Sequence, residues 1–365
     1  MRRFAAIEGL RGWLAWAVVL GHLSELSNIG LGMNGELGYR AVETFIIISG
    51  FIITNLIIGK PEPYRIYLLR RFMRIFPLFA VTCIAGYFAD DVLAWTCARV
   101  SYAGDPAFTM GRLCTAIARS NHEHFWAHAV LHLTMLHGAM SSSIVPLSQY
   151  AFDSPSWSLS LEWQFYLVAP LIVMLVAPAR GYALLALFAG VMLFPWYRSH
   201  LFGDFVSPSF LPDAADYFAI GIASRLALPR LASRTLGIAA LIVAALIVLC
   251  SLNLFAARAE FAFELMPWAI WAAVLSRIVA TDDRPALLRR WYDVMLEGNI
   301  ATYFGSRSYS VYLCHLPLIA VCHVLLYSLV PEAGSLQTFV LLTAISVPAI
   351  LVAAELLYRG VERPG

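Results

Sequence analysis

The chain has 365 residues, of which 60% are hydrophobic and 13% charged, and its mean hydropathy is +0.73. Soluble domains of this size do not tolerate so apolar a composition, so we expect a multi-pass protein of a lipid bilayer. A formal net charge of +2 is too small to indicate a nucleic-acid partner. The first residues lack a small-residue cleavage site after a short apolar core, so we expect a retained first span and no signal peptide.

Ten apolar segments are long enough to cross a bilayer as helices. They cover residues 5–27, 38–59, 75–95, 157–178, 182–198, 210–229, 236–256, 261–280, 304–330 and 336–358. The sequence has neither a linker nor a repeat of fixed period that would indicate a second domain. The sequence therefore predicts an all-α transmembrane helical bundle of about ten spanning helices, in one domain over residues 1–365 with no appended soluble domain.

A shorter apolar segment at 125–140 carries three histidines and is marginal for a span. Positively charged residues mark the cytoplasmic loops of membrane proteins. If ten segments cross, the main Lys and Arg clusters all fall on one side, whereas a single crossing by 125–140 would put the later clusters outside. We therefore expect 125–140 to be re-entrant or to lie along the outer interface. Both termini are then cytoplasmic, and residues 96–156 are extracytoplasmic.

The first predicted span contains Arg11 and His22, two residues that are costly to place in a bilayer. Eleven helical positions come to about three full turns, so both side chains share one helix face, about 16 Å apart. The topology puts Arg11 nearer the cytoplasm and His22 nearer the outer face. The pair therefore indicates a functional site that reaches across the membrane. The alternative is structural, because Glu8 could neutralise Arg11 from one turn away.

His22 has the chemistry of a base, since a neutral imidazole can take a proton from a hydroxyl group. A carboxylate can orient such an imidazole, and Glu25 is the local candidate. A second carboxylate, Glu162, follows Trp157 in SPSWSLSLEWQFYLVAP and lies about one turn inside its span, where it needs a partner. Three roles stay open for Glu162: holding a substrate hydroxyl group, positioning His22, or pairing with an arginine of another helix.

Three arginines, Arg70, Arg71 and Arg74, mark the cytoplasmic mouth of the third span. Arg71 and Arg74 share a helix face. Guanidinium groups suit phosphate oxygens, so this cluster could hold an anionic cofactor that approaches from the cytosol. The alternative is an ordinary positive anchor at the membrane edge.

Two weaker motifs are VETFIIISGF and GSRSYSVYLCHLPLI. In the first, Glu43 lies near the outer end of the second span, and Ser49 and Gly50 are small enough to let helices approach, so we interpret the motif as packing. In the second, His315 lies in an apolar run and must find an internal partner. His315 is then either structural or part of the lining of a substrate path.

We expect no metal site. The six cysteines show no CxxC spacing. The three histidines His128, His132 and His137 lack an acidic partner motif. Cys97 and Cys114 share a polar loop and could form a disulfide if that loop faces an oxidising compartment.

Five motifs occur in the order seen in membrane acyltransferase family 3: GLRGWLAWAVVLGH, FIIISGFIIT, RRFMRIFPL, SWSLSLEWQFYL and SYSVYLCHLPL. The chain resembles this family over nearly its whole length. The resemblance implies a ten-helix transmembrane enzyme that moves acetyl or related acyl groups from cytosolic acyl-CoA to hydroxyl groups of extracytoplasmic sugars or small molecules. The chain departs from the family at Phe45, Ile46, Ile47 and Ile48, where the usual run of phenylalanines keeps one aromatic residue.

Carried onto this chain, the resemblance implies that His22 is the catalytic histidine and that Arg11 acts with it. By expected role, the candidate residues are catalytic His22, Arg11 and Glu162, donor-binding Arg70, Arg71 and Arg74, and substrate-binding Glu25, Glu43, Trp157, Ser158 and His315.

The sequence and the resemblance together predict an O-acyltransferase of the bacterial inner membrane. Acetyl-CoA is the favoured donor, and the acceptor is an exopolysaccharide, an O-antigen or a lipid-linked glycan. His22 is either a general base or a transient acyl carrier. The alternative function is a transporter or flippase for a lipid-linked sugar or an acyl-modified small molecule, which also needs intramembrane charges and many spans.

Overall fold

The computed structural model describes residues 4–29, 36–179, 205–231, 264–279 and 286–363. These residues form helices and connecting turns with no strand among them, which confirms the predicted all-α class. The α-helices are α1 (Ala5–Leu26), α2 (Glu36–Gly59), α3 (Tyr64–Cys97), α4 (Thr109–Glu123), α5 (Phe125–Leu133), α6 (Trp157–Ala179), α8 (Ala215–Ala227), α11 (Met266–Ile278), α12 (Ala286–Met295), α13 (Asn299–Ser306), α14 (Ser308–Leu329) and α15 (Ser335–Leu357). Shorter helical turns lie at His137–Ala139, Ser154–Ser156, Leu211–Ala214, Leu228–Arg230 and Tyr358–Glu362.

Among the described residues, five helical segments are long and apolar enough to cross a membrane. They are Glu36–Gly59, Tyr64–Cys97, Ser154–Val176, Ser308–Leu329 and Ser335–Glu362. The predicted count of about ten spans is therefore supported only in part. The predicted spans 182–198 and 236–256 lie outside the described residues. Helices α8 and α11 have 13 residues each, which make about 20 Å of helix against a hydrocarbon core of about 30 Å.

Helix α1 has 22 residues but is not one of the five apolar segments. It carries Glu8, Arg11, His22 and Glu25 where a lipid-facing helix would carry apolar side chains. More than half of its residues are buried against other helices, chiefly α2, α13 and α14. Contact with protein on most sides explains why this helix can hold polar groups that lipid would not accept.

The segment 125–140 does not form a spanning helix. Helix α5 has nine residues, which make about 14 Å of helix, and a turn at His137–Ala139 follows it. This length covers less than half of a hydrocarbon core of about 30 Å. This geometry agrees with the expectation that residues 125–140 do not cross the membrane as a single span. Its side of the membrane stays a prediction.

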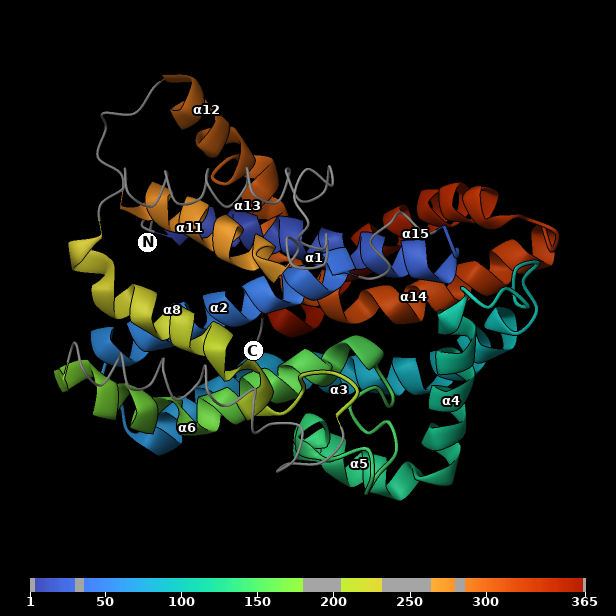
Figure 1. The fold of residues 1–365 in the computed structure, drawn as a ribbon, viewed down its shortest axis with the longest axis horizontal. Helices are drawn as coiled ribbons and strands as arrows, with labels where there is room; N and C mark the ends of the chain where they lie inside the picture. The colour runs from blue at the N-terminus through green and yellow to red at the C-terminus, as the bar shows by residue number, and fades with distance from the viewer. Residues whose placement is uncertain (1–3, 30–35, 180–204, 232–263, 280–285, 364–365) are drawn as a thin grey trace, which may run out of the picture.

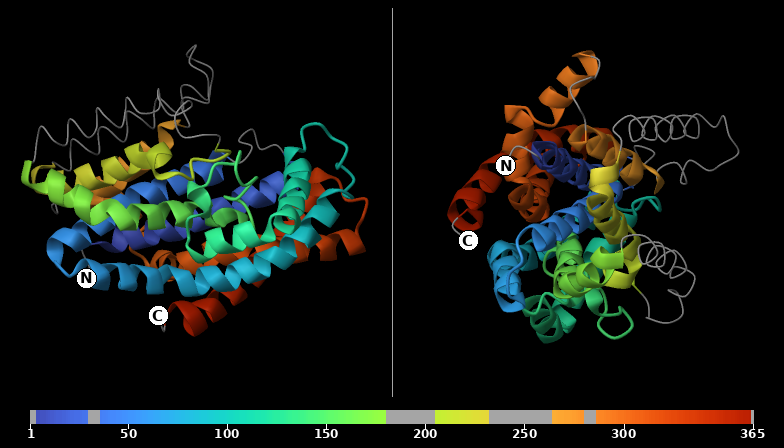
Figure 2. Two further views of the ribbon diagram at one scale, coloured as in Figure 1. Left: turned by 90° about the horizontal axis from the view of Figure 1, so that it is seen from below. Right: turned by 90° about the vertical axis from the view of Figure 1, so that its left-hand side faces the viewer.

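Two hydrophobic clusters hold the bundle together, and α1 belongs to both. Leu10 and Leu14, in the first half of α1, pack with α2, α3, α6, α8 and α11. Val19, Leu23 and Leu26, in the second half, pack with α4, α14, α15 and the far end of α3. Figure 1 shows the long helices side by side with α4 across one end, and Figure 2 shows the same bundle from below and end-on. Helix α1 therefore connects the two clusters.

Large apolar side chains stay exposed on the outer helices. Phe88 of α3, Met174 of α6 and Leu329 of α14 are 66%, 71% and 79% exposed. Soluble proteins rarely expose apolar surface on this scale, so these helix faces fit contact with lipid. The exposed surface and the apolar spans together indicate a membrane protein.

Helices α2 and α8 touch at two glycines. A Cβ atom at Gly50 would lie 2.6 Å from the carbonyl oxygen of Phe218, and one at Gly221 would lie 2.2 Å from that of Ile47. Neither position has room for a side chain, so the two backbones pack directly against each other. This contact agrees with the interpretation of the SGF motif as packing. Ser49 and Phe218, beside the contact, line the same cavity.

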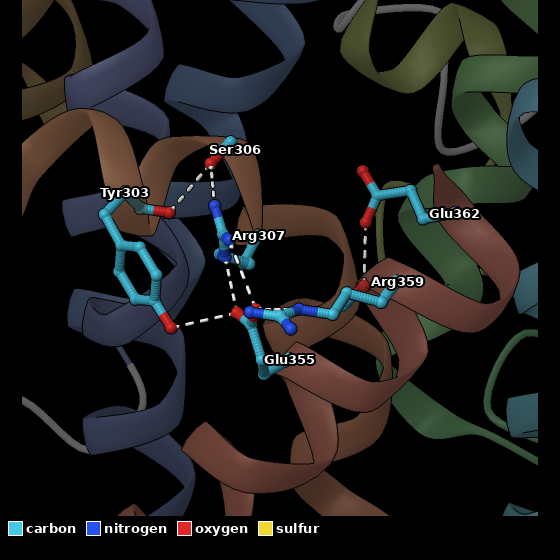
Figure 3. Close-up of polar contacts among 7 residues, drawn as sticks. Tyr303, Ser306, Arg307, Glu355, Arg359 and Glu362 are labelled. Atoms are coloured by element: carbon cyan, nitrogen blue, oxygen red, sulfur yellow. Dashed lines mark hydrogen bonds and ion pairs between the residues drawn. The ribbon is translucent and has the colours of Figure 1, made fainter. Parts of the chain in front are cut away.

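A polar network joins α15 to α13 and α14 (Figure 3). Glu355 accepts hydrogen bonds from Nε of Arg307 at 2.7 Å and from the hydroxyl group of Tyr303 at 2.9 Å. Beyond it, Ser310 of α14 donates to Glu362 at 2.7 Å. The network fixes the end of α15, and with it the carboxylate of Glu362, against the bundle.

Candidate active site

Among the cavities that the described residues form, two adjoin each other within the bundle. The first, which we call the arginine cavity, has a volume of about 250 Å³ and includes Arg11 in its lining. The second, the histidine cavity, has a volume of about 190 Å³ and includes His22 and Glu25. The polar side chains of the arginine cavity are Arg11, Ser49, Arg71, Arg74, Ser158, Glu162, Tyr166, Ser308, Tyr309 and Tyr312. The two ends of the α1 face thus open into different cavities.

Three arginines meet in the arginine cavity, since Arg71 and Arg74 of α3 join Arg11 of α1 in its lining. Nε of Arg71 is buried and has no hydrogen-bond partner among the described residues. Arg70 is not in the lining that the described residues form, and it makes an ion pair with Glu62 at 2.7 Å. Two of the three arginines predicted on α3 for donor binding therefore face the cavity, and Arg70 does not.

The structure does not support the pairing of Arg11 with Glu8. Both residues are described, no ion pair joins them, and Glu8 is exposed. The acidic side chains within electrostatic reach of Arg11 are instead Glu162 of α6 and Glu362 beyond α15, while Arg74 adds a like charge. The environment of Arg11 is thus assembled from distant parts of the chain.

Glu162 is held by two hydroxyl groups. Ser49 of α2 donates to its Oε1 at 2.8 Å, and Tyr166 donates to the same oxygen. Glu162 lines the cavity that contains Arg11, and the described lining of the histidine cavity does not include it. Of the three roles left open for this carboxylate, the geometry fits an acidic neighbour of arginine and not an orienting group for His22.

His22 has Glu25 as its carboxylate neighbour. Nδ1 of His22 lies 3.1 Å from Oε2 of Glu25, one helical turn later, and both side chains are about a quarter exposed, at 26% and 23%. When Nδ1 carries the proton and donates it to the carboxylate, Nε2 is left as an acceptor. The pair is therefore arranged as a base with an orienting group at the wall of a cavity.

His315 lies beside His22, with the two ring centroids 5.2 Å apart. Its Nδ1 donates to the carbonyl oxygen of Tyr312 at 2.7 Å, and its Nε2 has no hydrogen-bond partner in the described part of the chain. His315 is fully buried, and neither lining formed by the described residues includes it. His315 thus lies beside the His22 ring and outside both described linings, and of the two roles left open by the sequence, structural or lining a substrate path, the geometry fits the structural one.

The wall of the histidine cavity combines aromatic and acidic groups. The rings of Tyr39 and Trp157 are nearly parallel, with centroids 6.4 Å apart, and both residues line the cavity. Asp90 of α3 also lines it and accepts a hydrogen bond from Asn121 at 2.8 Å. Sequence reasoning missed Asp90, although a carboxylate inside the predicted span 75–95 was itself a signal.

Two side chains, Val42 of α2 and Tyr312 of α14, line both cavities. The hydroxyl group of Tyr312 donates to the carbonyl oxygen of Pro155 at 2.8 Å and lies 2.8 Å from Oγ of Ser158. Ser158, predicted as an acceptor contact, therefore faces the arginine cavity and holds the tyrosine between the cavities. Sequence reasoning missed Tyr312, whose signal was a hydroxyl group one turn before His315 in an apolar helix.

A family model described as an acyltransferase domain matches residues 4–359. The chain belongs to membrane acyltransferase family 3. It is therefore an acyltransferase, and the enzymatic prediction is favoured over the transporter. No solved structure matches the chain.

This acyltransferase is similar in sequence to three named proteins. A protein described as a membrane-bound transacylase, BcsY of Komagataeibacter xylinus, is 28% identical over 98% of the chain and 82% of that protein. The peptidoglycan O-acetyltransferase OatA of Listeria monocytogenes is 25% identical over 98% of the chain, which spans 55% of OatA. The acyltransferase MdmB of Streptomyces mycarofaciens is 28% identical over 48% of the chain and 40% of MdmB.

Glu43 of this acyltransferase was a candidate substrate-binding residue, but the linings of the two cavities that the described residues form do not include it. It is buried and accepts hydrogen bonds from Arg40 at 2.9 Å and from the hydroxyl group of Tyr217 at 2.6 Å. Tyr217 belongs to α8, so Glu43 links α2 to α8. The contacts agree with a packing role.

The three histidines around α5, His128, His132 and His137, are buried in this acyltransferase. The rings of His132 and His137 stack with centroids 4.0 Å apart. Burial lowers the pKa of His128 to about 4 and holds the pKa of His137 well below its usual value, so both are neutral near pH 7. Within the described residues, no three His, Cys, Asp or Glu side chains are grouped in a way that could hold a metal ion.

Proposed function

We propose that this acyltransferase moves an acyl group, with acetyl favoured, from cytosolic acyl-CoA to a hydroxyl group of an extracytoplasmic sugar. The observation that carries the proposal is the pair of adjoining cavities, one lined by arginines and the other by His22 and Glu25. The O-acetyltransferase activity in the name of OatA is consistent with it. The bacterial inner membrane, with both termini in the cytoplasm, is part of the same proposal.

The arginine cavity suits an anionic donor. Planar guanidinium groups bind phosphate oxygens through paired hydrogen bonds, and Arg11, Arg71 and Arg74 all line this cavity. The unpartnered Nε of Arg71 would gain an acceptor from the ligand. A volume of about 250 Å³ is below the range of about 300–1,000 Å³ that is usual for drug-sized ligands. The cavity would therefore hold the thioester arm, with the phosphates at the exposed mouth beside Arg74.

Two carboxylates allow three arginines to share one site. Glu162 and Glu362 both lie within electrostatic reach of Arg11 and offset the repulsion from Arg74. Each carboxylate is held by hydroxyl groups, Glu162 by Ser49 and Glu362 by Ser310. The cavity then keeps an ordered set of cations without requiring the donor to neutralise all of them.

His22 would act on the acceptor in one of two ways. As a base, its Nε2 takes the acceptor's hydroxyl proton while the hydroxyl oxygen attacks the thioester carbonyl carbon; the carbon–sulfur bond breaks, and the proton passes to the departing thiolate. As a carrier, Nε2 attacks the carbonyl carbon itself and the thiolate leaves; the acceptor hydroxyl oxygen then takes the acyl group, the carbon–nitrogen bond to the imidazole breaks, and the hydroxyl proton passes to the thiolate. A trapped acyl-histidine under single turnover separates the two routes.

The histidine cavity has features that suit a sugar. Tyr39 and Trp157 offer aromatic faces, and Glu25 and Asp90 offer acceptors for hydroxyl groups. Mass spectrometry of surface glycans from a deletion strain would name the acceptor, because a lost acyl mass identifies the acyl group and the acceptor together.

The test is thiol release from acetyl-CoA, with and without oligosaccharide acceptors, by the purified protein in lipid nanodiscs. His22→Ala should lower the rate at least about 100-fold and Glu25→Gln at least about tenfold, because the base and its orienting group are lost. The control is His122→Ala, an exposed histidine of α4. Equal rates for His22→Ala and the wild type, at matched thermal stability, would overturn the role of His22.

A further inference from the structure

The junction between the two cavities is formed by Val42 and Tyr312, which line both of them. In the proposed function the donor occupies the arginine cavity, while the attacking group lies in the histidine cavity. The acyl group has to reach from one into the other. The side chains at the junction therefore decide which acyl groups fit.

Tyr312 is a fixed side of this junction. Its hydroxyl group donates to the carbonyl oxygen of Pro155 and lies 2.8 Å from Oγ of Ser158, which can donate to it. Its ring contacts Phe45 edge-on, with the centroids 6.0 Å apart. A buried phenol with both hydrogen-bonding roles used and its ring packed does not move aside without losing these contacts.

The backbone of Val42 is fixed as well. The following residue, Glu43, is buried and accepts hydrogen bonds from Arg40 and from Tyr217 of α8. One turn earlier, α2 passes close to α1, because a Cβ atom at Gly38 would lie 3.6 Å from Cα of Val18. The helix is held on both sides of Val42, so the width of the junction depends on the valine side chain.

We propose that Val42, set against the fixed ring of Tyr312, limits the donor to short-chain acyl thioesters. Its two methyl groups are buried, with 4% of the residue exposed, and they occupy space that the carbons of a longer acyl chain would need. An acetyl group has one carbon beyond the carbonyl and passes, whereas each further methylene has to displace packed atoms. This inference rests on the proposed function.

The experiment measures transfer rates from acetyl-, butyryl-, hexanoyl- and octanoyl-CoA. In the wild type the rate should fall as the chain lengthens. Val42→Ala should raise the ratio of hexanoyl to acetyl transfer at least about tenfold, and Val42→Leu should lower the ratio of butyryl to acetyl transfer. Val19→Ala is the matched control, because it is the same truncation at a buried position of α1 that lies in the hydrophobic core. Its length profile should equal that of the wild type.

A binding measurement supplies a second readout. In a His22→Ala background, hexanoyl-CoA should raise the melting temperature of Val42→Ala more than that of the parent, while CoA alone should stabilise both equally. An unchanged length profile in Val42→Ala would overturn the proposed limit on acyl-chain length but not the proposed function. Equal transfer of octanoyl and acetyl groups by the wild type would do the same. A wild type that cleaves none of these thioesters would overturn the proposed function, so the two failures are distinguishable.

Discussion

Arg70 and Arg74 lie one turn apart on α3, yet they have different surroundings. Arg74 lines the arginine cavity, whereas Arg70 is paired with Glu62. Arg74→Ala should raise the KM for acyl-CoA by about 10- to 100-fold, because a hydrogen bond to a charged group contributes about 1.5–3 kcal/mol. Arg70→Ala should change this KM by less than about twofold, because an exposed ion pair contributes about 0–1 kcal/mol. Steady-state kinetics in nanodiscs checks both values.

Arg74→Lys refines this comparison, because it keeps the positive charge and removes the planar, forked guanidinium group. A KM between those of the wild type and Arg74→Ala is expected if the fork binds phosphate. Equal effects of Arg70→Ala and Arg74→Ala would contradict the site, since they would indicate a general attraction of the anionic donor to a basic surface. That attraction would also disappear with added salt.

At the scale of single elements, the histidines of the α5 region make folding sensitive to acid. Burial lowers the pKa of His128 from 6.5 to about 4. Above pH 6.5 the imidazole is neutral in the folded and unfolded states and adds no pH dependence. Below it, the unfolded chain binds a proton that the folded chain resists, so the free energy of unfolding should fall by about 1–2 kcal/mol down to pH 5.

Thermal unfolding in detergent between pH 7 and pH 5 measures this loss. His128→Gln should flatten part of the slope, because glutamine can still bond to Ser120, the present partner of Nε2 at 3.1 Å, without titrating. Identical slopes for His128→Gln and the wild type would show that this histidine does not carry the effect.

The five long apolar helices, α2, α3, α6, α14 and α15, were predictable, because the length of an apolar run is a local property that sequence displays directly, whereas the more polar α4 and α12 were not predicted. The placement of side chains between helices was not predictable either. Glu162 could have held a substrate hydroxyl group, positioned His22 or paired with an arginine, and it is contact with Ser49, 113 positions away, that holds it in the cavity of Arg11. Glu43 likewise bonds to Tyr217, 174 positions away. Such contacts depend on which helices pack together, which no local pattern specifies.

At the scale of the whole molecule, α1 connects two sites of different chemistry. Arg11 and His22 share one helix face about 16 Å apart, and each opens into its own cavity. In the proposed topology the arginine cavity faces the cytosol and the histidine cavity faces outward. The acyl group then crosses at the junction of the cavities, and the bulky anionic part of the donor never has to enter the apolar core.

The proposed topology also predicts the redox state of Cys97 and Cys114. Both are buried free cysteines with their sulfur atoms 3.0 Å apart, and Cys114 lines the histidine cavity. If residues 96–156 lie outside the cytoplasm, this pair folds in an oxidising compartment and should form a disulfide. The disulfide would link residues 17 positions apart and stabilise the fold by about 3 kcal/mol.

Alkylation of the denatured protein from native membranes, followed by peptide mass spectrometry, checks this prediction. Without reductant, the peptides of Cys97 and Cys114 should stay linked, whereas Cys83 and Cys322 should be alkylated and serve as internal controls. With reductant, all four should react. Full alkylation of Cys97 and Cys114 without reductant would place their loop in a reducing compartment. The histidine cavity would then face the cytosol, and the proposed transfer across the membrane would fail together with the topology.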